Sequence, residues 1–231
     1  MELNLAEILE AAQDRGAILT DDHVVLTPKP EGFFHAPGYF DKDRLLSSGR
    51  LLSATARIIA LRFRDQDIDV VVGPTYGAVG LAAATACWLS RIADREVDWV
   101  FAQEKAGESV KKGERMIGRY FPTIVKARRG LVTEDVFTSG GSAMATIEAV
   151  NQVGGMVAGV AVVCNRGGVT AEQLGVPMLE TLYDIPMLMH PEETCPLCAA
   201  GVPINMTVGH GKAFYERHPN SLVPRGAALA V

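Results

Sequence analysis

Two adjacent carboxylates stand directly before a loop of small and hydroxyl-bearing residues. Glu134 and Asp135 follow a short apolar run. Small residues let backbone N–H groups converge on an anion, hydroxyl groups add donors, and the helix expected next adds its dipole. The acids would repel a phosphate unless they bind something else, and sugar hydroxyls are natural partners for them. The pattern therefore predicts a sugar-monophosphate site, whose loop consists of Thr138, Ser139, Gly140, Gly141 and Ser142.

A second Gly-rich loop, within Val72–Leu81, also follows an apolar run and precedes a helical pattern. Its glycine spacing does not fit Gly-x-Gly-x-x-Gly, so by itself it is a weak indication of dinucleotide binding. A nucleotide-dependent oxidoreductase stays open as an alternative class.

Short apolar runs alternate with amphipathic patterns, which predicts strands alternating with helices. The runs show little internal polar alternation, as in a parallel sheet with helices on both faces, so the expected fold class is α/β. Lys29–Tyr39, rich in Pro, Gly and aromatic residues, is expected to be an irregular loop. The expected strands are Val24–Leu26, Asp69–Val72, Val97–Phe101, Leu131–Thr133 and Met156–Cys164, and the expected helices are Asn4–Arg15, Arg44–Phe63, Val79–Arg91 and Ser142–Val153.

The stretch Gln103–Arg129 interrupts this alternation. It is long, and it carries most of the Lys and Arg residues of the middle of the chain together with three glycines and a proline. Long loops in compact domains are usually functional or mobile. We therefore predict a basic, mobile lid over Gln103–Tyr120, which would close over a bound ligand and exclude water.

The segment Gly130–Ser142 resembles the phosphoribosyl pyrophosphate motif of type I phosphoribosyltransferases, in which apolar or small residues precede two acids and a Thr/Ser/Gly loop. The resemblance implies that Glu134 and Asp135 bind the ribose hydroxyls and that the loop holds the 5-phosphate. It makes Thr75–Gly77 the diphosphate loop, with a non-proline cis peptide at Thr75–Tyr76. It also implies Mg²⁺ as the cofactor, held through the donor substrate and waters with no direct protein ligand.

Three further segments resemble orotate phosphoribosyltransferases. They are His35–Asp43, Arg166 after its apolar strand, and Cys195–Pro203. The likeness implies transfer of ribose 5-phosphate to orotate with release of pyrophosphate, in a homodimer. It assigns a catalytic role to Lys105, and it suggests that Arg166 binds the orotate carboxylate. Lys29 or Lys42 would then hold the rest of the ring's polar edge.

The chain departs from the orotate enzymes in its basic residues. Those enzymes carry an Arg-Lys pair and a Lys-x-His-Gly run in the mobile loop, whereas this chain keeps Lys105 and has no histidine after it. Gly77 stands where a lysine is usual. Lys111, Lys112, Arg115 and Arg119 could supply the missing charge. A purine or another base stays open as the acceptor, as does a non-catalytic sensor of phosphoribosyl pyrophosphate.

Composition limits the partners. The chain has 231 residues, 48% of them hydrophobic, and a net charge of −5. These values favour one domain and give no general attraction for nucleic acid or an acidic membrane surface. We expect a cytoplasmic protein without a membrane span. We expect one phosphoribosyltransferase domain over 1–203, with a small hood from 1–43 and 165–203, and a tail over 204–220. Residues 221–231 include Leu-Val-Pro-Arg-Gly, the thrombin recognition sequence, and could be an engineered addition.

Four cysteines are too few for a disulfide framework in a chain of this length. Cys87 and Cys164 lie in apolar segments and are expected to be buried thiols. Cys195 and Cys198 form one Cys-x-x-Cys pair. A structural zinc site needs a second pair of ligands, and the histidines are scattered along the chain. We therefore interpret the pair as structural or incidental in preference to a metal site, and metal binding by Cys195 and Cys198 stays open.

Overall fold

In the computed structural model, residues 3–26, 32–107 and 113–219 are described. They form two compact units. Unit 1 contains the residues up to Ala11 and Leu45–Pro186, and unit 2 contains Ala12–Arg44 and the residues from Met187 onward. Unit 2 thus joins a segment near the N-terminus, 12–44, to the C-terminal part of the chain.

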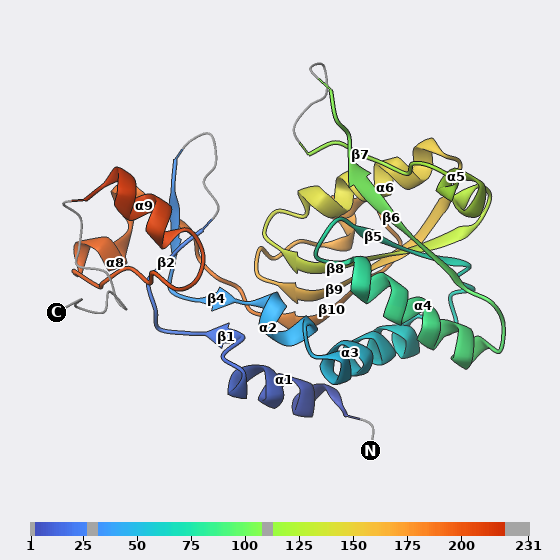
Figure 1. The fold of residues 1–231 in the computed structure, drawn as a ribbon, viewed down its shortest axis with the longest axis horizontal. Helices are drawn as coiled ribbons and strands as arrows, with labels where there is room; N and C mark the ends of the chain where they lie inside the picture. Colours follow the sequence, from blue (N-terminus) through green and yellow to red (C-terminus); the bar gives the residue numbers. More distant parts are fainter. Residues whose placement is uncertain (1–2, 27–31, 108–112, 220–231) are drawn as a thin grey trace. The chain divides into compact units, whose positions relative to one another are not determined.

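Unit 1 is built on a six-stranded sheet with the order β10-β9-β8-β5-β6-β7 (Figure 1). All neighbours pair in parallel except β7, which pairs antiparallel with β6. The predicted α/β class with a mostly parallel sheet is therefore confirmed. The strands are β5 (Val70–Pro74), β6 (Asp98–Glu104), β7 (Arg115–Met116), β8 (Arg129–Phe137), β9 (Met156–Asn165) and β10 (Leu179–Asp184).

Helices cover both faces of this sheet, with α3 (Gly49–Arg62) and α4 (Val79–Ala93) on one side and α6 (Gly141–Gln152) on the other (Figure 1). The expected single helix over Arg44–Phe63 is instead two helices, α2 (Lys42–Leu46) and α3. The Ser48 side chain accepts the Leu51 N–H and so begins α3 as its N-cap. The short α7 (Ala171–Leu174) follows β9 and has a capping box at Thr170.

The stretch 103–129 contains more regular structure than we expected. Gln103 and Glu104 belong to β6 and pair with Met116 and Arg115 of β7, so the two ends of the predicted lid form a β-ladder. Helix α5 (Phe121–Val125) follows. The tip, residues 108–112, including Lys111 and Lys112, lies outside the described residues.

Unit 2 is made of short elements. Strands β1 (Ile18–Leu19) and β4 (Tyr39–Phe40) pair with each other, and β2 (Val24–Val25), β3 (Phe34–Ala36) and β11 (His190–Pro191) form a second sheet. The expected irregular loop over 29–39 therefore contains β3 and the start of β4. Helix α1 (Leu5–Asp14) runs from unit 1 into unit 2. The C-terminal part holds η1 (Glu192–Thr194), α8 (Pro196–Ala199) and α9 (Gly211–Arg217).

The expected tail over 204–220 packs into unit 2 as far as it is described. Phe214 of α9 and Ile204 are buried with Val25 and Phe33. A second cluster contains Val24, Leu26, Ala36 and Val208. A tail would leave these apolar side chains in water, so their burial explains why the chain folds back here. Residues 221–231 lie outside the described residues.

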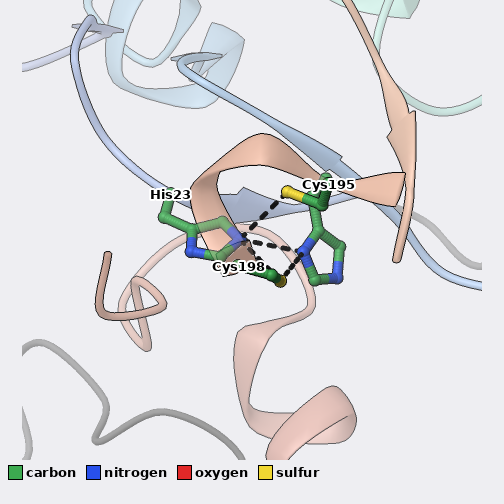
Figure 2. A group of neighbouring side chains, drawn as sticks. His23, Cys195 and Cys198 are labelled. Atoms are coloured by element: carbon green, nitrogen blue, oxygen red, sulfur yellow. Dashed lines mark hydrogen bonds between the residues drawn. The ribbon is translucent and has the colours of Figure 1, made fainter. Parts of the chain in front are cut away.

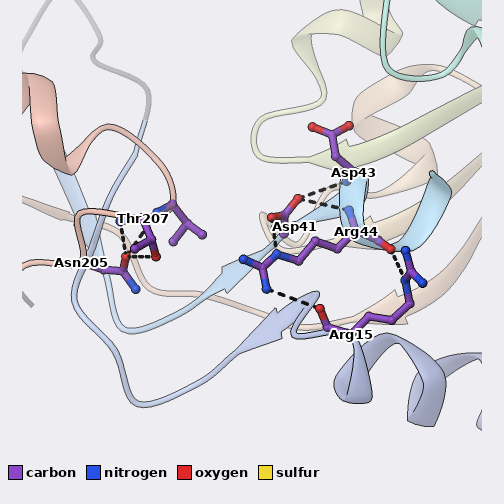
Figure 3. A network of polar contacts seen from close by, with 7 residues as sticks. Arg15, Asp41, Asp43, Arg44, Asn205 and Thr207 are labelled. Atoms are coloured by element: carbon purple, nitrogen blue, oxygen red, sulfur yellow. Dashed lines mark hydrogen bonds and ion pairs between the residues drawn. The ribbon is translucent and has the colours of Figure 1, made fainter. Parts of the chain in front are cut away.

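Polar contacts tie the end of α1 to the start of α2 (Figure 3). Arg15 Nε donates to the Arg44 carbonyl at 2.5 Å, and Arg44 Nη1 donates back to the Arg15 carbonyl at 3.4 Å. Arg44 Nε also lies 3.1 Å from Asp41 Oδ2. These reciprocal contacts hold the two chain segments together within unit 2.

In the part of the chain that the structure describes, no helix has the length and apolarity needed to cross a bilayer.

Candidate active site

The carboxyl ends of β5, β8 and β9 lie at one edge of the unit 1 sheet. Phe137, the last residue of β8, pairs with Asn165, the last residue of β9, and β5 pairs with β8 on its other side. Ligands of open α/β sheets bind at this edge, just beyond the strand ends. The loops after these three strands contain most of the residues that the sequence nominated.

The predicted phosphate loop follows β8 directly. Gly140 is the N-cap of α6 with φ 73°, a left-handed conformation that favours glycine. A Cβ on Gly140 would lie 3.0 Å from Val169 Cγ1 and 3.2 Å from Leu174 Cδ2. Glycine is therefore required here by backbone conformation and by packing against the segment around α7. The N–H groups of the first turn of α6 face the loop, as an anion site needs.

Glu134 and Asp135 lie inside β8, which extends to Phe137, and not at its end as the sequence suggested. Both are buried, with 5% and 8% of their surface exposed. The Asp135 N–H donates to Glu134 Oε1 at 3.1 Å, and among the described residues Glu134 Oε2 has no hydrogen-bond partner. Burial, and next the charge of Asp135, raise the pKa of Glu134 to about 8. A group that brings hydroxyl donors or a cation would therefore be stabilised at this pair.

The predicted diphosphate loop follows β5. The Thr75–Tyr76 peptide is cis, as expected, and Tyr76 is 93% exposed. The Thr75 N–H donates to the Ala102 carbonyl at 3.0 Å, which fixes the loop to β6. The loop lies beside the phosphate loop, because β5 pairs with β8.

Arg115 of β7 reaches this loop from the other end of the predicted lid. Its Nη1 donates to the Thr75 carbonyl at 3.2 Å, to Thr75 Oγ1 at 3.4 Å and to the Ala102 carbonyl at 3.1 Å. The side chain is buried. Sequence reasoning named Arg115 only as one of four candidate cations. Its position depends on the pairing of Glu104 with Arg115, which no local motif signals.

Arg166 lies beside the phosphate loop. Its Nε and Nη2 both donate to Thr138 Oγ1, at 3.2 and 3.0 Å. The Asn165 side chain holds the following turn through the N–H and carbonyl of Val169, at 3.0 and 2.9 Å. A Cβ on Gly167 would lie 1.7 Å from the Thr138 carbonyl, so only glycine permits this close approach. The structure therefore brings the predicted base-binding arginine against the predicted phosphate site.

The two nominated lysines have different outcomes. Lys105 follows β6 at the same sheet edge, and its Nζ lies 3.4 Å from Glu114 Oε2. This ion pair spans the two sides of the predicted lid. Lys29 lies outside the described residues.

A pocket of about 290 Å³ lies at the opposite edge of the same sheet. Asp69, Glu96, Asp98 and Arg128 line it. Three of these lining side chains already form ion pairs: Asp69 with Arg95, and Arg128 with Asp98. These contacts are those of a solvated charged surface, and the phosphate-binding features all lie at the other edge.

Unit 2 contains a separate group of potential metal ligands. Cys195 and Cys198 lie against His23 and His35, with one ligand atom of each residue within 4.8 Å of the others (Figure 2). The sequence left the cysteine pair without a second pair of ligands, and the fold supplies one. Burial lowers the pKa of both histidines, that of His35 to about 4, and so favours the neutral imidazole. Cys164 is buried as expected, whereas Cys87 is exposed, because its place on α4 turns it away from the sheet.

Comparisons with known proteins agree with this reading of unit 1. The profile of the phosphoribosyl transferase domain matches residues 41–177. The orotate phosphoribosyltransferase of Chlorobaculum parvum is 33% identical over 204 residues, which cover 87% of this chain and 93% of that protein. The orotate phosphoribosyltransferase of Thermus thermophilus is 30% identical over 200 residues, covering 86% of this chain and 98% of that protein.

Solved structures give the same result. Mycobacterium tuberculosis orotate phosphoribosyltransferase in complex with Fe(III) dicitrate has a TM-score of 0.58 at 26% identity, covering 78% of this chain and 96% of that chain. A complex of that enzyme with phosphoribosyl pyrophosphate has a TM-score of 0.50 at 28% identity, covering 63% of this chain and 80% of that chain. Together with the two loops and the acidic pair, these likenesses place the chain in the phosphoribosyltransferase family, as a phosphoribosyltransferase enzyme.

Proposed function

We propose that this enzyme transfers ribose 5-phosphate from phosphoribosyl pyrophosphate to orotate, forming orotidine 5′-monophosphate and pyrophosphate. The observation that carries the choice of orotate is the extent of the likeness. Orotate phosphoribosyltransferases match about 87% of the chain, well beyond the 41–177 of the family domain, and so include much of unit 2.

Residues of β8 and its loop bind the donor's ribose 5-phosphate. The N–H groups and hydroxyls of residues 138–142 hold the 5-phosphate, and Glu134 and Asp135 accept hydrogen bonds from the ribose hydroxyls. This role fits the buried Oε2 of Glu134, which lacks a partner among the described residues. A ribose hydroxyl there would satisfy it.

Mg²⁺ fits the same site, because Glu134 and Asp135 offer carboxylate oxygens in the strand that leads into the phosphate loop, and Mg²⁺ prefers oxygen ligands and retains waters. The ion would reach the protein mainly through the donor's oxygens and waters, near Asp135. When bound, it supplies positive charge that neutralises the diphosphate.

The reaction breaks the bond between C1 of the ribose and the diphosphate oxygen, and a nitrogen of the base forms the new bond to C1. Positive charge develops on the ribose and negative charge on the leaving diphosphate, so the protein's main task is electrostatic. Glu134 and Asp135 lie on the ribose side. Backbone amides of residues 75–77, Arg115 and Lys105 lie on the diphosphate side, and Lys105 would exchange Glu114 for the diphosphate.

Arg166 binds the carboxylate of orotate. A planar guanidinium binds a carboxylate through two parallel hydrogen bonds. Its contact with Thr138 Oγ1 holds the side chain at the phosphate loop, close to where C1 must lie. The polar edge of the ring is assigned to Lys29, outside the described residues, or to Lys42. Residues 103–120 close over the donor in a homodimer, so that water does not compete with the base.

A screen of pyrophosphate release tests this function. The purified chain is given phosphoribosyl pyrophosphate and Mg²⁺ with orotate, uracil, adenine, guanine or hypoxanthine, one at a time. We expect turnover with orotate alone, and release of orotate from orotidine 5′-monophosphate in the reverse direction. Turnover with a purine and none with orotate would overturn the acceptor. Tight binding of the donor without turnover of any base would indicate a sensor.

A further inference from the structure

The His/Cys group in unit 2 has the spacing of a tetrahedral metal site. His23 Nε2 lies 3.7 Å from Cys195 Sγ and 3.7 Å from Cys198 Sγ, and His35 Nδ1 lies 3.3 Å from Cys198 Sγ. Ligands of a zinc ion at about 2.0–2.3 Å would lie roughly 3.3–3.8 Å from one another in a tetrahedron. The two imidazole nitrogens are closer, at 2.8 Å, and would separate slightly around an ion.

The second nitrogen of His23 is arranged as metal sites require. Its Nδ1 lies 2.7 Å from the Val202 carbonyl, which can only accept a hydrogen bond, so Nδ1 carries the proton. Nε2 therefore keeps its lone pair and points it at the two thiols. Ligand histidines commonly have such a backbone carbonyl behind them, which fixes the tautomer and the ring orientation.

Strand pairing brings the four potential ligands together from distant parts of the sequence. Val25 of β2 pairs with His35 of β3, so His23 lies just before the paired residues. His35 also pairs with His190 of β11, and β11 leads through η1 to Cys195. Cys195 is the N-cap of α8, and Cys198 lies three residues later in its single turn. Both sulfurs therefore lie on the same side of this helix (Figure 2).

The His/Cys group is deeply buried, which is unusual for such side chains unless they bind an ion. His23 and His35 have no exposed surface, and Cys195 is 3% exposed. In a part of the molecule this short of regular structure, four soft ligand atoms converge where an apolar core would otherwise be expected. Small domains that lack a large core are commonly stabilised by a structural metal.

We propose that unit 2 carries a structural zinc site, in which His23 Nε2, His35 Nδ1, Cys195 Sγ and Cys198 Sγ bind one Zn²⁺. Two sulfurs and two imidazole nitrogens in a tetrahedron suit zinc above other common divalent ions. All four positions are taken by protein ligands, so the site is closed and structural, not catalytic. It is separate from the Mg²⁺ of the transfer reaction and lies entirely within unit 2.

Metal analysis of the full chain tests this proposal. Protein purified without chelators, or metal-free protein given Zn²⁺ alone, should contain about one zinc per chain. Co²⁺ in its place should give intense visible bands of a tetrahedral site and sulfur-to-cobalt charge-transfer bands in the near ultraviolet. Reduced protein that takes up no Zn²⁺, or Co²⁺ bands of a six-coordinate oxygen site, would overturn the proposal.

Variants identify the ligands. Cys198→Ala should lower the affinity for Zn²⁺ by well over about tenfold, and so should His35→Ala, because even residues that only support a metal ligand contribute about that much. Cys87→Ala removes an exposed thiol of unit 1, and His210→Ala removes a histidine of unit 2 outside the group, so both should keep one zinc per chain. Should the ligand variants fail to fold, chelation of the unmodified chain serves instead. It should lower the melting temperature, and Zn²⁺ should restore it. A full zinc complement in Cys198→Ala, or a melting temperature unchanged by chelation, would contradict the assignment.

Discussion

The folds of the two units are stabilised in different ways. Strands β8 and β9 of unit 1 are nine and ten residues long and almost wholly buried. Their side chains belong to one large apolar cluster that also takes in β5, β6 and α6. The strands of unit 2 are two or three residues long, and its described residues form two small apolar clusters.

Because of this difference, we expect polar residues to serve different purposes in the two units. Unit 1 buries enough apolar surface to tolerate two buried carboxylates near its edge, because stability is supplied elsewhere in the same core. Unit 2 has no comparable reserve, and we expect its stability to depend on the His/Cys group. A change in a polar residue should therefore affect activity in unit 1 and folding in unit 2.

Removal of zinc should have the largest effect, and only in unit 2. The binding energy of a structural zinc ion is folding energy, so amides of β2 and β3 should exchange with solvent at least about 10³-fold faster after chelation. Amides of β8 and β9 should keep their rates. Hydrogen exchange followed by mass spectrometry measures both in one sample. If amide exchange accelerated equally in the two units, the zinc ion would not stabilise unit 2 specifically.

Asp135→Asn should impair turnover while unit 1 remains folded. Loss of a charge that acts on the transition state costs roughly 10²–10³-fold in kcat. Glu148→Gln, on the exposed face of α6, is the matched control and should keep full activity. Steady-state kinetics and thermal melting of both variants measure the two effects. If Asp135→Asn also melts unit 1, the acidic pair is structural.

Arg166→Ala should affect the acceptor more than the donor. Loss of a charge-assisted pair costs about 1.5–3 kcal/mol, or roughly 10- to 100-fold in the KM for orotate. The KM for phosphoribosyl pyrophosphate should change much less, although the contact with Thr138 is also lost. Arg91→Ala, an exposed arginine of α4, serves as control. An equal rise in both KM values would mean that Arg166 acts on the phosphate of the donor and not on the base.

Glu134→Gln should change the pH dependence of unit 1 stability. The folded pKa of Glu134 is raised to about 8 from 4.5, so the unfolded chain loses this proton first as pH rises. The contribution of the protonated group is fully present below pH 4.5 and is lost as pH rises toward 8. The unmodified chain should therefore weaken relative to the variant over this range, by at least about 1.4 kcal/mol.

Urea unfolding at pH 5 and pH 8 measures this difference. Both tryptophans of the chain, Trp88 and Trp99, lie in unit 1, so their fluorescence reports that unit. Parallel pH profiles for the two proteins would mean that Glu134 ionises normally in the folded state.

The local features of unit 1 could be predicted well from the sequence. The acidic pair, the Gly-rich loop and the following helix are consecutive in the chain, so their types and order carry the information. The expected strands and helices lie within a few residues of β5, α4, β6, α6 and β9. The prediction failed at β3 and β7, which are short strands that depend on a partner, and it missed the local N-cap at Ser48 that separates α2 from α3. Two residues of strand have no periodicity to detect.

The sequence by itself determined the local structure of the proposed transfer site, because a strand, a Gly-rich loop and the helix after it are formed by neighbouring residues. Only the tertiary structure decided which distant side chains join it. Arg115 reaches Thr75 because β7 pairs with β6, and Arg166 meets Thr138 because β9 lies beside β8. The same reason applies to the proposed zinc site. His23 and His35 lie more than 150 residues before Cys195 and Cys198, and only strand pairing brings them within bonding distance of one ion.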